Sequence, residues 1–286
     1  MIPVLDGFDL VVPASLEAAL QILASDPDAR PFAGGTDLMV VLDAGHLSPG
    51  RYVSLWGIRE LHGIARDDRG GLVLNALTTF SEIRESPLVA DPYSMLALAA
   101  REIGGIATQN RATIGGNIAN ASPAADSPPA LLAYDAEIEL LSIRGRRRMP
   151  YGDFHTDYKK MRLEPGEIVA RVVLPPRPGG WRDGYRKVGT RRAQAISKVC
   201  LAASVLMDGD RVADVRLALG SIAPTVVRCR HAEDAVRRQR LNERVIADAA
   251  RALVSDIAPI DDIRSTSEYR RAVAQNLVAA FLRDSL

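Results

Sequence analysis

The chain has 286 residues, of which 47% are hydrophobic and 25% are charged, so it can bury a core and form two or three domains. Its formal net charge is +1, which excludes a general electrostatic attraction to nucleic acid or to an anionic membrane surface. Its two cysteines, Cys200 and Cys229, are too few to hold an iron–sulfur cluster, and we expect both to be buried free thiols.

The N-terminal residues predict a strand–helix–strand–helix–strand segment. Ser15 is placed to cap a helix over 16–23, in which apolar residues recur at helical spacing. A short strand over 30–33 runs into the pair Gly34-Gly35, a second helix follows, and a strand over 51–55 ends the segment. This glycine pair therefore precedes a helix N-terminus, where free N–H groups and the helix dipole favour a phosphate.

The pattern changes from about residue 58. After a glycine turn and a strand, a short helix begins at Thr78 or Thr79, and further strands are predicted over 136–141 and 167–174. Residues 104–127, which precede the strand over 136–141, are polar and show little periodicity, so we expect them to form a loop. A loop of this length inside a compact domain usually carries function, and this one contains a second glycine pair.

A linker rich in proline and glycine, over 175–180, precedes the third part of the chain. Residues 185–220 predict a three-stranded antiparallel meander, and the rest is helical, with Ser267 expected to cap the last helix. The fold class is therefore α+β. We predict three domains, over residues 1–57, 58–176 and 181–286.

The two glycine pairs share one pattern. They lie in Ala33-Gly34-Gly35-Thr36-Asp37 and in Thr113-Ile114-Gly115-Gly116-Asn117. Glycine accepts positive φ and lets a ligand approach the main chain, so each pair can form a concave row of amides that binds an anion. Two such nests suit the linked phosphates of a dinucleotide, although either segment alone is more typical of an ordinary glycine turn.

The sequence contains none of the usual catalytic patterns, such as a GxGxxG, a P-loop or a GxSxG motif. His155 has no evident partner, which favours a turn or packing role, and the arginines of 144–148 suggest a solvated hairpin tip. Asp126 is the only acid of its segment, and it can cap the next helix or accept a hydrogen bond from a bound heterocycle. We predict no catalytic residue and no metal site, and infer that a cofactor supplies the chemistry.

No stretch is long and apolar enough to span a bilayer, and the first residues lack the pattern of a signal peptide. We therefore expect no membrane insertion and a cytoplasmic location.

Four motifs in the chain resemble one family along its full length. They are AGGTD, TIGGNIANASPAAD, FHTDYKK and YRKVGTRRAQAISKV. Together they resemble the FAD-binding medium subunit of the xanthine dehydrogenase and carbon monoxide dehydrogenase family of molybdenum hydroxylases, with most likeness to the bacterial xanthine dehydrogenase branch. The resemblance implies a two-subdomain FAD-binding fold of the PCMH type, followed by a C-terminal α+β domain, with FAD between the first two subdomains.

The resemblance also implies where FAD is held. Residues 31–38 would hold one side of the pyrophosphate and residues 113–117 the other. Asp126 would lie near the flavin or its ribityl chain, and the charge of Lys187 could stabilise reduced flavin or a phosphate, although an exposed strand lysine is an equal alternative. We expect Asp37 to face away from the pyrophosphate and to cap its helix. The FAD-binding residues so implied are Pro31, Phe32, Ala33, Gly34, Gly35, Thr36, Asp37, Leu38, Ile103, Thr113, Ile114, Gly115, Gly116, Asn117, Asn120, Ser122, Asp126, Val169 and Lys187.

Members of this family pass electrons from a molybdenum cofactor through two iron–sulfur clusters to FAD, and then to NAD or another acceptor. The resemblance therefore implies two partners, a large molybdenum-cofactor subunit and a small 2Fe–2S subunit. Two alternatives remain at this point. The chain could be a self-sufficient flavoprotein oxidoreductase, or a nucleotide-binding scaffold without redox activity.

Overall fold

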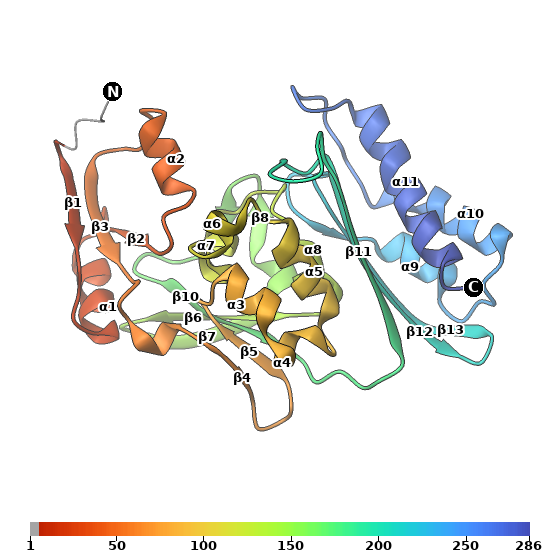
Figure 1. The fold of residues 1–286 in the computed structure, drawn as a ribbon, viewed down its shortest axis with the longest axis horizontal. Coiled ribbons are helices and arrows are strands. Elements are labelled where there is room, and N and C mark those ends of the chain that lie inside the picture. The colour runs from red at the N-terminus through yellow and green to blue at the C-terminus, as the bar shows by residue number, and fades with distance from the viewer. Residues whose placement is uncertain (1–5) are drawn as a thin grey trace.

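The structure is a computed structural model that describes residues 6–286. It contains three main sheets that follow one another along the chain, and Figure 1 shows them side by side from the N-terminal to the C-terminal end. We call the parts built on these sheets the first, second and C-terminal domains. The domain boundaries at residues 57, 176 and 181 remain predictions.

The first domain is a small parallel sheet with two helices, as the sequence predicts. The strand order is β1-β3-β2, and both strand pairs are parallel. Ser15 caps α1 by accepting a hydrogen bond from the Ala18 amide at 3.1 Å. The elements are β1 (Phe8–Val11), α1 (Leu16–Ser25), β2 (Arg30–Phe32), α2 (Leu38–Asp43) and β3 (Gly50–Ser54).

The second domain is a five-stranded antiparallel sheet with helices packed over one face (Figure 1). Strand β10 lies at its centre, and Ile168 and Ala170 of this strand also belong to the hydrophobic cluster of the first domain. The core is therefore continuous between the two domains. The sheet has the order β4-β5-β10-β6-β7 and consists of β4 (Ile64–Arg66), β5 (Leu72–Asn75), β6 (Glu137–Ser142), β7 (Gly145–Pro150) and β10 (Ile168–Leu174).

The remaining elements of the second domain are short. The α-helices are α3 (Phe80–Glu85), α4 (Pro87–Ala90), α5 (Ser94–Glu102), α6 (Ile106–Gln109), α7 (Ile114–Ala119) and α8 (Pro128–Ala133). The 3-10 turns are η1 (Arg59–Leu61) and η2 (Tyr151–Asp153), and a separate hairpin consists of β8 (His155–Asp157) and β9 (Lys160–Met161).

The expectation that residues 104–127 form one loop is wrong, because α6 and α7 lie within them. The sequence of α7, which contains two glycines and Asn117 and ends before Asn120, has little intrinsic helical preference. Its helix is instead stabilised by a Thr113 side-chain cap and by packing of its buried residues, which tertiary structure supplies and local sequence does not show.

The C-terminal domain is an antiparallel sheet covered by helices on the face away from the second domain (Figure 1). Its sheet has four strands rather than the three expected, because the two-residue β14 was too short to stand out in the sequence. The last helix is capped by Thr266, one residue before the expected Ser267. The elements are β11 (Trp181–Val188), β12 (Val199–Asp208), β13 (Arg211–Gly220), β14 (Val227–Arg228), α9 (Arg230–Val236), α10 (Glu243–Ala252), η3 (Leu253–Ser255) and α11 (Ser267–Arg283).

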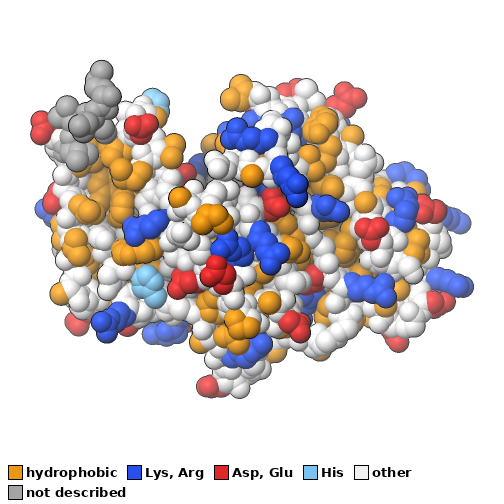
Figure 2. Space-filling view, viewed as in Figure 1, with side chains coloured by type: hydrophobic (Ala, Val, Ile, Leu, Met, Phe, Trp, Pro, Cys, Tyr) orange, Lys and Arg blue, Asp and Glu red, His pale blue; other side chains and the backbone are white. Residues whose placement is uncertain are grey.

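The surface carries both signs of charge. Figure 2 shows lysines and arginines interspersed with acidic side chains, in agreement with the net charge of +1. The arginines of 144–148 lie at the turn of the β6–β7 hairpin and just after it, and most of them are exposed, as expected of a solvated hairpin. Three of them lie on the edge strand β7, where Arg146 and Arg148 pair with the buried Glu139, and Arg147 pairs with Glu167. Among residues 6–286 we find no helix with the length and hydropathy needed to cross a membrane.

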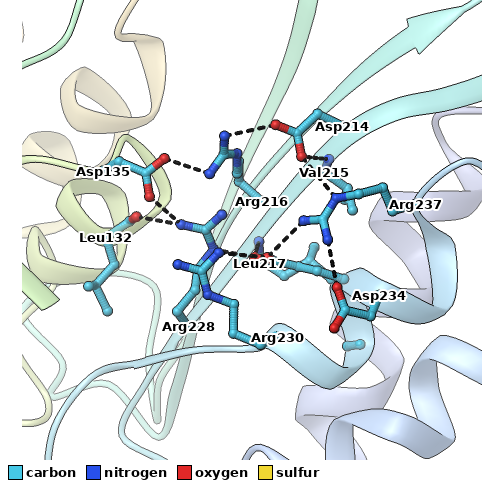
Figure 3. Close-up of polar contacts among 12 residues, drawn as sticks. Leu132, Asp135, Asp214, Val215, Arg216, Leu217, Arg228, Arg230, Asp234 and Arg237 are labelled. Atoms are coloured by element: carbon cyan, nitrogen blue, oxygen red, sulfur yellow. Dashed lines mark hydrogen bonds and ion pairs between the residues drawn. The ribbon is translucent and has the colours of Figure 1, made fainter.

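Polar contacts attach the C-terminal domain to the second domain at several places. At one of them, Arg228 of β14 donates to the Leu132 carbonyl at 3.0 Å and to Asp135 at 2.7 Å, while Arg216 of β13 donates to the other Asp135 oxygen at 2.6 Å (Figure 3). The other side of Arg228 pairs with the fully buried Glu233. Arginines from two strands therefore converge on the chain that follows α8.

The second contact centres on Asp183 of β11. Arg177 donates to both of its carboxylate oxygens at 2.6 Å, and Ser94 and Tyr134 of the second domain donate to it at 3.0 and 2.9 Å. The side chains of Arg177 and Asp183 are each only 9% exposed. The predicted linker is therefore anchored by a buried, bidentate ion pair.

We predict that Asp183→Asn lowers the free energy of unfolding by about 3–5 kcal/mol, because it leaves the buried Arg177 guanidinium without its charge partner. Urea unfolding of the full chain measures this loss. Glu243→Gln is the matched control, since it removes an exposed ion pair with Arg283 and should leave the stability nearly unchanged. If the two substitutions lowered the free energy of unfolding equally, burial of the Asp183–Arg177 pair would not be the cause of the loss.

Candidate cofactor site

The first glycine pair lies in the connection between β2 and α2. Gly35 has a φ of +76°, as expected for a turn that requires glycine. Among the residues that the structure describes, the backbone amides from Gly34 to Leu38 donate to no protein acceptor. A row of unpaired amides in a turn is a site for an anion, so this segment has the properties predicted for it.

Gly34 is required for a different reason, namely close approach to the second domain. A Cβ at this position would lie 1.8 Å from the carbonyl oxygen of Arg111, so no side chain fits. This contact places the first glycine segment against the residues that precede α7. A Cβ on Gly116 would in turn lie 3.8 Å from the Cβ of Ala33. The two glycine segments are therefore neighbours, as the sequence predicts.

The second glycine pair is not a nest of free amides, and this part of the prediction is wrong. Gly115 and Gly116 are helical residues of α7, and neither has a positive φ. The Gly115 amide donates to the Ala76 carbonyl at 2.8 Å, and the Gly116 amide donates to the Thr113 hydroxyl at 3.1 Å. A Cβ on Gly115 would lie 2.6 Å from the Cβ of Ala76. Glycine here allows α7 to pack closely on its neighbour.

A chain of polar contacts joins the first domain to the second beside these segments. The Asn120 side-chain amide donates to Asp37 at 3.1 Å. Lys159, from the turn between β8 and β9, donates to both the backbone and the side-chain oxygen of Asn120, at 2.7 and 2.6 Å. Asp37 is the N-cap residue of α2, but its carboxylate makes no capping bond and is turned toward Asn120 instead. Lys159 was not among the predicted residues.

Asp126 and Lys187 form a buried ion pair between the second and C-terminal domains. The Lys187 ammonium lies 2.7 Å from Asp126 Oδ2 and donates to the Glu102 carbonyl at 2.8 Å. The two side chains are 11% and 5% exposed, so the exposed-lysine alternative is wrong. Capping by Asp126 is also wrong, because Ser127 is the N-cap residue of α8 and makes no side-chain cap bond.

One oxygen of this pair has no partner. Asp126 Oδ1 is buried and accepts no hydrogen bond from the residues that the structure describes. Burial raises the pKa of Asp126 to about 6, although the nearby Lys187 charge opposes the rise. A buried carboxylate oxygen without a donor is costly in a protein alone, and it fits a ligand that brings an N–H or O–H group to it.

Tyr185 and Cys200 support the ion pair from behind. The Tyr185 hydroxyl donates to the Asp126 backbone carbonyl at 3.0 Å, and the Cys200 thiol donates to the Tyr185 oxygen at 3.1 Å. Burial raises the pKa of both the thiol and the phenol, so both stay protonated. Asp183, Tyr185 and Lys187 alternate along β11, and each contacts the second domain. This period-two pattern of polar residues was the signal that could have identified Tyr185.

Other predicted residues make local or core contacts. Asn117 accepts a hydrogen bond from Ser127 at 2.7 Å, Ser122 closes a local turn, and Ile103 and Val169 are buried in the core of the second domain. His155 has the packing role expected of it, because its Nε2 is 2.9 Å from the Ile118 carbonyl and its ring lies against Tyr151. Burial lowers the pKa of His155.

Both cysteines are buried free thiols, as predicted. Within residues 6–286, no three or more His, Cys, Asp or Glu side chains gather in a way that could hold a metal ion. The chain therefore offers two groups of binding residues, the free amides near Gly35 with Asn120 and the orphan oxygen of Asp126 with Lys187.

Comparison with known proteins identifies the family. The protein-family model described as FAD binding domain in molybdopterin dehydrogenase matches residues 6–177. A second family model, described as CO dehydrogenase flavoprotein C-terminal domain, matches residues 184–285. The chain is an FAD-binding medium subunit of the molybdenum hydroxylase family. The resemblance expected from its motifs is thus confirmed, and so are its classification as an oxidoreductase subunit and FAD as its cofactor.

Relatives match this medium subunit over nearly its whole length. It is 34% identical over 277 residues to the putative xanthine dehydrogenase FAD-binding subunit of Escherichia coli, covering 96% of this chain and 94% of that protein. Identity to the glyceraldehyde dehydrogenase medium chain of Sulfolobus acidocaldarius is 32%, covering 94% and 95% of the two chains. Carbon monoxide dehydrogenase from Hydrogenophaga pseudoflava superposes with a TM-score of 0.92 at 29% identity, covering 98% and 96%.

The raised pKa of Asp126 predicts a pH dependence of stability. Its folded-state pKa of about 6 lies above the ordinary value of 3.8, so proton uptake favours the folded state. The stability that this proton contributes is fully present below pH 3.8 and is lost as the pH rises through 6.

We therefore expect the FAD-free wild type to gain free energy of unfolding relative to Asp126→Asn as the pH falls from 7.5 to 5, because the variant cannot titrate at this position. Urea unfolding at each pH measures the difference. A difference that stays constant over this range would mean that Asp126 keeps an ordinary pKa in the fold.

Proposed function

We propose that this chain holds FAD between its first and second domains, with the C-terminal domain completing the flavin end of the site, and that it relays electrons to a soluble acceptor. The proposal rests on two sets of hydrogen-bonding groups that have no partner in the protein. The amides from Gly34 to Leu38 lack acceptors, and the buried Asp126 Oδ1 lacks a donor. A dinucleotide with a diphosphate and an N–H-bearing ring supplies both.

The residues divide into two parts by their chemistry. The amides from Gly34 to Leu38 would hold the diphosphate, and Asn120, next to them, would add a side-chain donor. Asp126 would accept a hydrogen bond at the flavin or ribityl chain, while Lys187 supplies a buried positive charge. When bound, FAD supplies the electron-accepting chemistry, and the protein contributes binding, orientation and local charge.

The first test is FAD binding to the full chain and to Lys187→Met. We expect the wild type to bind FAD and the variant to bind it about tenfold more weakly, because a charged donor and the partner of Asp126 are lost together. The midpoint potential of the bound flavin should also fall, since a nearby positive charge favours the reduced state. Isothermal titration and spectroelectrochemistry measure the two quantities.

Lys198→Met is the control for this test. Lys198 lies over the ring of Tyr269 on α11, so its removal should change neither FAD affinity nor potential. A wild-type chain that does not bind FAD would overturn the proposed site. If Lys187→Met had the FAD affinity and the midpoint potential of the wild type, Lys187 would not belong to the site.

We also propose that the chain works as one subunit of a complex. It would receive electrons from a small 2Fe–2S subunit, which is reduced by a large molybdenum-cofactor subunit, and pass them to NAD or another acceptor. Support comes from relatives named as medium chains or FAD subunits. The free thiols of Cys200 and Cys229 are in keeping with a reducing cytoplasm.

This proposal predicts that the FAD-loaded chain alone oxidises no small-molecule substrate, and that activity requires co-expressed large and small subunits. Reduction of the bound flavin, followed by its absorbance, is the measurement. Substrate-dependent flavin reduction in the isolated chain would instead support a self-sufficient flavoprotein, and a stable chain that neither binds FAD nor assembles with partners would support a scaffold.

A further inference from the structure

Lys159 combines two features that the proposed function does not yet use. It lies in the turn of the β8–β9 hairpin with a φ of +56°, a conformation that side-chain-bearing residues seldom adopt. Its ammonium reaches away from the hairpin to Asn120, with two hydrogen bonds of 2.7 and 2.6 Å. The adjacent Lys160 is also exposed, but its ammonium pairs with Asp157 of the same hairpin instead.

These contacts determine how Asn120 is oriented. The Lys159 ammonium can only donate, so it must face the side-chain oxygen of Asn120 and leave the NH₂ group on the other side. That NH₂ group donates to Asp37 Oδ1 at 3.1 Å. Lys159 thus sets the direction of a donor that joins the second domain to the first domain, next to the free amides of residues 34–38.

Asp37 creates an electrostatic problem in this place. Its carboxylate belongs to the segment whose amides would hold a diphosphate, and like charges at short range disfavour one another. Its side chain accepts the Asn120 bond, and the Lys159 ammonium is the cation on the far side of that amide. Partial burial lowers the pKa of Lys159, and the charge of Asp37 opposes this shift.

We propose that Lys159 is a cofactor-site residue that offsets the charge of Asp37 through Asn120, and so allows the segment 34–38 to accept the diphosphate of the nucleotide. This role presupposes the FAD-binding function proposed above. Lys159 then acts in two ways, as a positioning residue for the Asn120 amide and as a counter-charge for Asp37.

The test compares the affinity of the FAD-free full chain for FAD in matched lysine variants. We expect Lys159→Met to weaken FAD binding by about tenfold, since it removes a cation and frees the Asn120 amide to turn. Lys160→Met carries the same chemical change one residue away and should bind FAD as the wild type does. Thermal unfolding of both FAD-free variants shows whether the fold is retained.

Asp37→Asn provides a second test, because it should raise the affinity for FAD where Lys159→Met lowers it. In the Lys159→Met background it should recover most of the lost affinity, because the charge that Lys159 offset is gone. Added salt should also reduce the difference between wild type and Lys159→Met, since screening weakens the Asp37 repulsion.

The outcomes are distinguishable. Wild-type affinity in Lys159→Met would overturn the proposal, and so would a loss that Asp37→Asn does not restore and salt does not reduce, because the effect would then be structural. A wild-type chain without FAD affinity would instead overturn the proposed function itself.

Discussion

The buried ion pair between Asp126 and Lys187 is the interaction on which the site depends. Removing two charges from water is costly, and only a close partner with further hydrogen bonds offsets that cost. Lys187 meets this condition with Asp126 and the Glu102 carbonyl, and the Asp126 peptide is held by Tyr185. Because the partners belong to different domains, this requirement holds the C-terminal sheet against the second domain. The free oxygen of Asp126 leaves room for one additional donor at that junction.

The two glycine segments use the same residue for different physical purposes. In the first, Gly35 adopts a left-handed conformation that leaves neighbouring amides unpaired, and Gly34 allows a backbone contact with Arg111. In the second, the absence of a side chain at Gly115 lets a helix lie against Ala76. The first segment therefore has backbone donors without protein acceptors, while the second forms a closely packed helix beside it.

Much of the fold could be predicted from sequence, because it depends on local signals. The cap at Ser15 and the turn at Gly34-Gly35 can be recognised from a few neighbouring residues. Features that depend on distant partners were missed. The sequence does not show that Lys187 meets an acid 61 residues away, or that Lys159 reaches Asn120. Helix α7 was missed for the same reason, since packing rather than intrinsic preference stabilises it.

The position of β11 has a consequence for how the protein matures. Lys187 and Tyr185 come from a strand that pairs with β12 over its full length, and β12 pairs in turn with β13. More than two thirds of the polypeptide must therefore be synthesised before the proposed flavin end of the site can form. A nascent chain that stops short of this sheet therefore cannot present Lys187 and Tyr185 to the second domain.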